Sequence, residues 1–159
     1  MAFSMIAAVG KDLELGKNGD LCFRLKKDMN FFKETTKGHP VIMGGNTFRS
    51  LRKPLPGRTN IVLSRSDDFP EGVEVYHSKD EIIAKYQDAD AFIIGGAKIY
   101  EMFLPDSDKI YLTEIDANTD ADVYFPDFNK SDYNREVIGS DTEDNINFEF
   151  VVYTKKEEL

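Results

Sequence analysis

Asp28 is a charged residue at a position where the sequence pattern predicts an apolar one. It lies in residues 25–37, where polar and apolar residues recur with the period of a helix. On that helix Asp28 falls within the apolar stripe, flanked by Phe31 and Phe32. An ionised carboxylate loses solvation in such surroundings, so its pKa should be raised. A ligand with a cationic or hydrogen-donating group would compensate the charge, which makes Asp28 a candidate catalytic acid.

Two ordinary structural roles compete with this interpretation. An acidic residue in the first turn of a helix interacts favourably with the helix dipole and can cap free N–H groups. Arg24 could instead form a buried ion pair with Asp28. The residues of this segment alone leave these alternatives open.

Paired glycines follow two predicted strands. Gly44-Gly45 follows residues 40–43, and Gly95-Gly96 follows residues 91–94. Glycine lets backbone N–H groups approach a ligand, and the helix N-termini that follow attract phosphate. A third junction, Ser64-Arg65, adds a hydroxyl and a guanidinium group. Together the junctions suit the two halves of a dinucleotide, although no G-x-G-x-x-G or Walker lysine motif is present.

Two more polar residues are candidates for binding. Arg58, after a Pro-Gly turn, has the fork geometry that suits a carboxylate, although a surface arginine is the commoner case. Thr113 lies on a predicted strand, where threonine is usually just a good strand former. Two histidines and the single Cys22 do not form a zinc ligand set. No Ser-His-Asp or Cys-His arrangement is evident.

The candidate residues are distributed over alternating strands and helices. Apolar runs predict strands at residues 3–9, 40–43, 59–63, 73–76, 91–94, 109–115 and 148–153. Helices are predicted at residues 25–37, from residue 46, at 78–86 with Ser78 as the N-cap, and after Gly96 as far as Leu104. Residues 10–24 read as a long polar loop. This alternation indicates an α/β fold with a mostly parallel sheet, whose ligands lie beyond the carboxyl ends of the strands.

Composition restricts the classes of partner. Apolar residues make up 41% and charged residues 31%, which suits one globular domain over residues 1–159. The net charge of −9 argues against nucleic acid or an anionic membrane as partner. The longest apolar stretch, residues 91–97, is too short to cross a bilayer. Because the N-terminus has no basic region and the chain has one cysteine, we expect a cytoplasmic protein.

Taken in order, short motifs of this sequence resemble the dihydrofolate reductase family over nearly the whole chain. They lie at residues 6–8, 15–16, 25–33, 40–44, 47–51, 54–58, 63–65, 93–100, 112–113 and 124–126. The resemblance implies an eight-stranded, mostly parallel sheet with an antiparallel C-terminal strand and four flanking helices. It also implies that a monomeric enzyme transfers hydride from NADPH to dihydrofolate, and so supplies one-carbon metabolism.

The resemblance also implies roles for individual residues. Asp28, supported by Thr113, would bind the pterin ring and favour its protonation by a water molecule, and Arg58 would bind the carboxylate of the glutamyl tail. The residues that would line the substrate pocket are Ile6, Phe32 and Leu55. Those that would hold NADPH are Ala8, Leu15, Gly44, Asn46, Thr47, Ser64, Arg65, Gly95, Gly96, Ala97, Lys98, Ile99 and Tyr100. A cis peptide bond is expected between Gly95 and Gly96, and residues 10–24 are expected to close over the site.

The sequence departs from the family pattern at two places near the expected site. Cys22-Phe23 stands where bacterial members commonly have Pro-Trp, and Phe23 lacks the indole N–H that helps to hold a water near the substrate. Gly45 stands where some members place an arginine or lysine near the cofactor phosphate. That role would then pass to Arg65.

Two rival functions remain. A reductase of the same fold, acting on a pyrimidine of riboflavin synthesis, would keep the cofactor glycines but would not need Asp28, Phe32 and Arg58 together. A non-catalytic acidic binding module would need none of these residues and would not oxidise NADPH.

Overall fold

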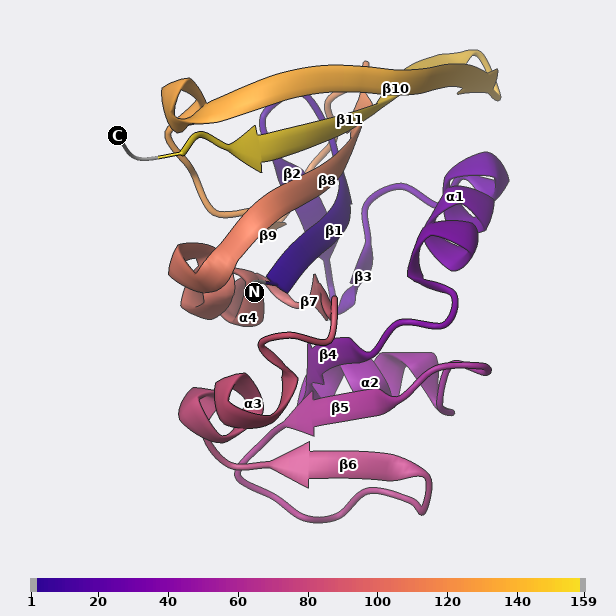
Figure 1. The fold of residues 1–159 in the computed structure, drawn as a ribbon. Helices are drawn as coiled ribbons and strands as arrows, with labels where there is room; N and C mark the ends of the chain where they lie inside the picture. Colours follow the sequence, from indigo (N-terminus) through magenta and orange to yellow (C-terminus); the bar gives the residue numbers. More distant parts are fainter. Residues whose placement is uncertain (1–2, 158–159) are drawn as a thin grey trace.

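The computed structural model describes residues 3–157, which form two β-sheets and four α-helices. The larger sheet has eight strands in the order β10-β11-β8-β1-β7-β4-β5-β6 (Figure 1). In that order the strands are Tyr133–Glu143, Ile146–Lys155, Ser107–Ile115, Phe3–Val9, Phe92–Gly95, Val41–Gly44, Asn60–Leu63 and Val73–Tyr76. The helices α1 to α4 are Lys26–Thr36, Gly45–Leu51, Lys79–Tyr86 and Ala97–Phe103. Two short 3₁₀ helices are Leu104–Asp106 and Lys130–Asp132.

The strand directions agree with the expected topology. The pairs β8–β1, β1–β7, β7–β4, β4–β5 and β5–β6 are all parallel. Strand β11 runs antiparallel to both of its neighbours, β8 and β10. The predicted α/β fold, with an eight-stranded mostly parallel sheet and an antiparallel strand near the C-terminus, is confirmed.

Successive residues of the central strands pack on opposite faces of the sheet. Ile42 and Ile61 belong to the core beneath α3 and α4, whereas Val41, Met43 and Val62 belong to the core that contacts α1 and α2. Figure 1 shows α3 and α4 on one side of the sheet and α1 on the other. Because side chains alternate along a strand, a strand covered on both faces reads as a continuous apolar run.

Within residues 3–157 the structure contains four strands that the sequence did not predict, namely β2 (Glu14–Lys17), β3 (Asp20–Leu21), β9 (Val123–Tyr124) and β10. Residues 10–24 contain β2 and β3, which form a three-stranded sheet with β9. Strand β10 was not predicted, since its residues after Tyr133 are almost all exposed and show no apolar alternation. Pairing with β11 therefore determines β10, rather than burial of its own side chains.

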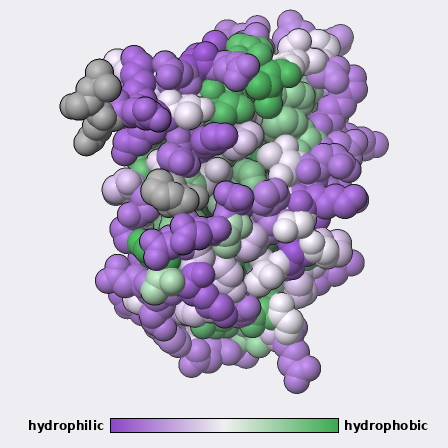
Figure 2. Space-filling model, viewed as in Figure 1, coloured by the Kyte–Doolittle hydropathy of each residue, from purple (hydrophilic) through white to green (hydrophobic). Residues whose placement is uncertain are grey.

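The face of the molecule seen in Figure 1 is mainly hydrophilic, with a hydrophobic area in its upper part, over β10 and β11 (Figure 2). The exposed apolar side chains of β10 are Val137 and Ile138. None of the helices between residues 3 and 157 is long and apolar enough to cross a membrane.

Candidate active site

Asp28 on α1 meets the sheet at Thr113 on β8. Thr113 Oγ1 donates a hydrogen bond of 2.5 Å to Asp28 Oδ1. Burial raises the pKa of the Asp28 carboxyl, the hydrogen bond from Thr113 acts in the opposite direction, and the nearby charge of Glu143 adds to the rise. The result is a raised pKa, as the position of Asp28 among apolar residues predicted.

Two of the ordinary roles considered for Asp28, capping and an ion pair with Arg24, are filled by other residues. The backbone N–H groups of Lys26 and Lys27 donate to the Glu143 carboxylate, each at 2.9 Å, so Glu143 of β10 caps the helix. Arg24 pairs with Asp20, at the exposed surface, and not with Asp28. Neither capping nor an ion pair with Arg24 therefore explains why a carboxylate lies on this face of α1.

The helix that carries this carboxylate packs into an apolar cluster. Ile6, Phe32 and Leu55 belong to one apolar cluster, in which Ile6 is buried and the other two keep some exposed surface. Phe31, on the other side of Asp28, stacks on Phe150 with a centroid distance of 4.2 Å and an interplanar angle of 16°. The structure thus brings the three predicted pocket residues into one cluster with Phe31, which like Phe32 belongs to α1, the helix that carries Asp28.

Arg58 lies at the end of α1, on a turn that a buried asparagine holds in place. Its guanidinium group donates to Thr36 Oγ1 at 2.8 Å and to the Pro56 carbonyl at 2.9 Å. The Asn60 side chain donates to the Leu55 carbonyl at 2.9 Å and the Arg58 carbonyl at 3.0 Å, and accepts from the Leu55 N–H at 2.8 Å. Asn60 therefore positions both Leu55 and Arg58. Its signal in the sequence was a polar residue at the start of an otherwise apolar strand.

The two paired-glycine junctions lie side by side, because β4 and β7 are neighbours in the sheet. A Cβ atom added at Gly96 would find one atom within 4 Å, Thr47 Oγ1 at 3.6 Å, so this glycine faces open space beside the start of α2. The Gly95-Gly96 peptide is cis, as the resemblance implied. At Gly44 a Cβ would approach Ile99 Cγ1 to 3.1 Å, so the two junctions pack closely behind this space. The glycines and the Thr47 hydroxyl form a cradle that fits a phosphate-bearing cofactor.

The other predicted cofactor residues lie around these junctions. Ser64 and Arg65 follow β5, the strand next to β4, while Ala8 pairs in register with Thr113. Leu15 is buried on β2. Tyr100 is buried on α4 and donates to the Ile6 carbonyl at 2.7 Å, which ties the second junction to β1. The first residues of α2 and α4 supply Asn46, Ala97 and Lys98.

A buried carboxylate anchors the base of residues 10–24. Glu14 accepts hydrogen bonds from the N–H of Asp12 at 2.7 Å and from Asn118 Nδ2 and the N–H of Thr119, both at 2.9 Å. Burial alone would raise the pKa of Glu14, but these hydrogen bonds lower it to about 2. Sequence analysis did not single out Glu14, because a glutamate in a polar segment reads as exposed.

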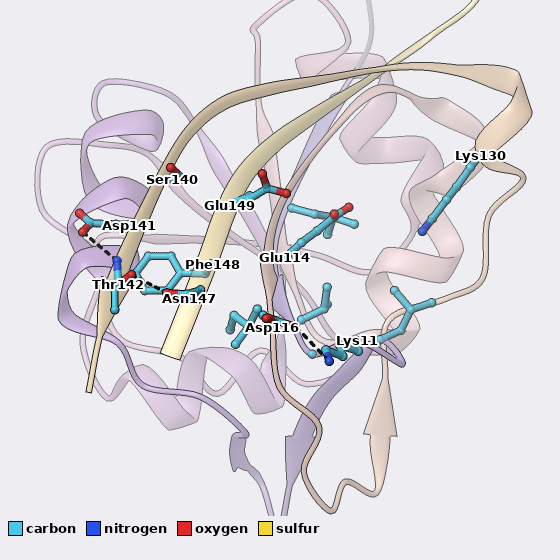
Figure 3. Close-up of a pocket in the computed structure, with 15 residues that line it drawn as sticks. Lys11, Glu114, Asp116, Lys130, Ser140, Asp141, Thr142, Asn147, Phe148 and Glu149 are labelled. Atoms are coloured by element: carbon cyan, nitrogen blue, oxygen red, sulfur yellow. Dashed lines mark hydrogen bonds and ion pairs between the residues drawn. The ribbon is translucent and has the colours of Figure 1, made fainter. Parts of the chain in front are cut away.

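A cavity of about 580 Å³ lies on the other side of β8 (Figure 3). Glu114 lines this cavity, whereas Thr113, the preceding residue, faces α1. Charged residues of its lining form ion pairs: Lys11 pairs with Asp116 at 3.0 Å, Glu114 with Arg135 at 2.7 Å, and Asp141 with Lys27 at 2.9 Å. These ion pairs are formed within the protein, and we place the candidate active site at Asp28.

Metal ligation and cysteine chemistry find no support in residues 3–157. No three His, Cys, Asp or Glu side chains there are grouped so that they could hold a metal ion. Burial and the charges of Glu14 and Asp122 raise the pKa of the Cys22 thiol, and its Sγ lies 3.7 Å from the Asp120 carbonyl. A raised pKa disfavours the thiolate, the reactive form.

The sequence matches a family model described as dihydrofolate reductase over residues 2–155. The chain belongs to the dihydrofolate reductase family. It is 44% identical to dihydrofolate reductase type 3 of Salmonella typhimurium over 130 residues, which are 80% of each chain. It is 36% identical to dihydrofolate reductase of Haemophilus influenzae over 160 residues, 98% of this chain and all of the relative.

A solved dihydrofolate reductase has the same fold. The enzyme from Enterococcus faecalis, complexed with NADP(H) and RAB-propyl, superimposes with a TM-score of 0.88 at 29% sequence identity. The match covers 98% of this chain and 97% of that structure. The family resemblance inferred from short motifs is therefore confirmed over the whole fold.

Proposed function

We propose that this protein reduces 7,8-dihydrofolate to 5,6,7,8-tetrahydrofolate with NADPH and so supplies one-carbon metabolism. One observation carries the proposal: Thr113 donates a hydrogen bond to the Asp28 carboxylate, whose pKa is raised by burial, on a helix whose Phe32 packs in one apolar cluster with Ile6. Family membership and the fold shared with an NADP(H) complex support the same conclusion.

The substrate side of the site is assigned to residues on α1, β1, β8 and the turn before β5. Asp28 accepts hydrogen bonds from the amino group and the adjacent nitrogen of the pterin ring, and its charge favours protonation of the ring that receives the hydride. A water molecule delivers the proton. Ile6, Phe32 and Leu55 pack against the ring system, and Arg58 binds the carboxylate of the glutamyl tail.

NADPH supplies the hydride when it is bound. The space in front of Gly96, bordered by the Thr47 hydroxyl, suits its diphosphate. Ser64 and Arg65 lie where a further phosphate could be held, after the strand that neighbours β4. The residues proposed to complete the cofactor site are Ala8, Leu15, Gly44, Asn46, Gly95, Ala97, Lys98, Ile99 and Tyr100.

We also propose that the protein acts as a monomer in the cytoplasm, without nucleic-acid partners. The single cysteine suits a reducing compartment. The net charge of −9 repels polyanions.

The direct test is the loss of NADPH absorbance in the presence of purified protein and dihydrofolate. We expect oxidation only when both are present, and a strong loss of rate in Asp28→Asn. The pyrimidine intermediate of riboflavin synthesis serves as the alternative substrate. Turnover of that compound but not of dihydrofolate would replace the proposed substrate with the rival one.

A further inference from the structure

Arg49 on α2 turns its guanidinium group back toward the start of its own helix. The group lies over the ring of Phe69, with the guanidinium carbon 5.0 Å from the ring centroid. Its Nη1 atom donates to Asn46 Oδ1 at 3.5 Å. An exposed arginine side chain is thus held beside the junction between β4 and α2, where the proposed cofactor site begins.

Gly45 leaves the space that Arg49 enters. A Cβ atom at Gly45 would lie 3.3 Å from Arg49 Nη1, 3.3 Å from Ser64 Oγ and 3.2 Å from the Phe69 ring. The guanidinium group and the Ser64 hydroxyl therefore border one small region in front of the glycine. A side chain at position 45 would force these neighbours to shift.

Arg49 has no anionic partner within the described protein. Of the six arginines, Arg24 and Arg135 form ion pairs with carboxylates, whereas Arg49, Arg52, Arg58 and Arg65 form none within residues 3–157. The protein carries 29 acidic residues against 20 basic ones, so unpaired arginines do not result from a shortage of carboxylates. A guanidinium group beside a hydroxyl is a donor set that suits a phosphate monoester.

We propose that Arg49, together with Ser64 and Arg65, binds the 2′-phosphate that distinguishes NADPH from NADH. The inference rests on the proposed function, because it places a contact within the proposed cofactor site. It revises the expectation that Gly45 leaves this role to Arg65 alone. Gly45 lacks a basic side chain, but by lacking a Cβ it admits the basic side chain of Arg49.

The test is calorimetric titration of wild type, Arg49→Gln and Arg52→Gln with NADP⁺ and with NAD⁺. Arg52 is the matched control, since it is an exposed arginine at the other end of α2 with no carboxylate partner in residues 3–157. We expect Arg49→Gln to weaken NADP⁺ binding about tenfold, the size of one charge-assisted hydrogen bond, and to leave the Kd of NAD⁺ unchanged. Arg52→Gln should alter neither Kd, and Arg49→Lys should retain part of the preference.

A purely structural Arg49, packed on Phe69, predicts a different result. The melting temperature of Arg49→Gln would fall, and any loss of binding would be equal for NADP⁺ and NAD⁺. Equal losses, or an unchanged Kd for NADP⁺, would overturn the assignment of Arg49 and leave the proposed function intact. If the wild type binds neither nucleotide, the proposed function itself fails.

Discussion

Thr113 and Asp28 are separated by 85 positions in the sequence and joined by a hydrogen bond of 2.5 Å. Thr113 belongs to β8, in the interior of the larger sheet, whereas Asp28 belongs to an 11-residue helix whose apolar face packs on that sheet. The hydroxyl fixes one oxygen of the carboxylate on the rigid side of the site. The sheet therefore contributes directly to the orientation of the candidate acid.

Removing the charge of Asp28 should separate activity from stability. Asp28→Asn should lose most of its activity at neutral pH, and its remaining activity should rise as the pH falls, since more substrate then arrives protonated. Because the pKa of Asp28 is raised in the folded state, its ionisation opposes folding above that pKa. The variant should therefore melt at a higher temperature than wild type at pH 7.

This gain in stability should disappear below the pKa of an unfolded aspartate, about 3.9, where Asp28 is protonated in both states. Dihydrofolate turnover, measured between pH 4 and pH 8, and melting temperature, measured between pH 3 and pH 8, check both parts. A variant that melts lower but turns over as fast as wild type at pH 7 would make Asp28 a structural residue.

Thr113→Val should change the pH profile of the enzyme. The substitution removes the hydrogen bond that lowers the pKa of Asp28, while burial continues to raise it. The acidic limb of the kcat/KM profile should move to higher pH. Thr113→Ser keeps the hydroxyl and should keep the wild-type profile. Identical profiles for the valine and serine variants would mean that the hydrogen bond does not set the protonation of Asp28.

Arg58→Leu should raise the KM for dihydrofolate far more than it lowers kcat, because tail binding is largely shared by ground and transition states. The loss of charge-assisted hydrogen bonds should cost about 1.5–3 kcal/mol. Steady-state kinetics measure both constants. Arg52→Leu makes the same change at an exposed arginine and should leave both constants unchanged. A normal KM in Arg58→Leu would remove this residue from the substrate site.

Glu14→Gln should destabilise the protein at neutral pH. The folded pKa of Glu14 is about 2, below the ordinary value of 4.5, so its ionised form stabilises the fold above pH 4.5. That contribution is lost as the pH falls from 4.5 toward 2. The difference in melting temperature between variant and wild type should thus be full at pH 7 and smaller at pH 3. Glu71→Gln, at an exposed position, is the control, and equal melting temperatures of Glu14→Gln and wild type at pH 7 would contradict this role.

The sequence predicted the elements that show apolar runs or apolar periodicity. The bounds of β1 and β6 agree with the structure to the residue, and α3 begins after its predicted N-cap, Ser78, which accepts from the Glu81 N–H. Strands β2, β3, β9 and β10 were missed, because their positions depend on pairing with other strands. Local periodicity contains no information on such pairing.

For the site, residue type and helical spacing were sufficient to place Asp28 next to apolar residues. They were not sufficient to predict the residues that position the site residues, such as Glu143, which caps α1, and Asn60, which donates to the Arg58 carbonyl. Each of these residues forms hydrogen bonds to backbone groups. Because every residue has a backbone, the sequence does not show which backbone groups are the partners. Arg49 was not predicted as a site residue for a related reason. The direction of its side chain depends on the space left by Gly45.

The capping of α1 by Glu143 also has a consequence for the order of events during biosynthesis. A chain made from its N-terminus releases α1 from the ribosome long before Thr113 and Glu143, which hold the candidate acid and the first turn of its helix. The helix and its carboxylate lack these anchors until β8 and the β10–β11 hairpin have been made and have paired. A nascent chain therefore gains the geometry of its active site late in translation, and fragments that stop before the hairpin lack the cap of α1.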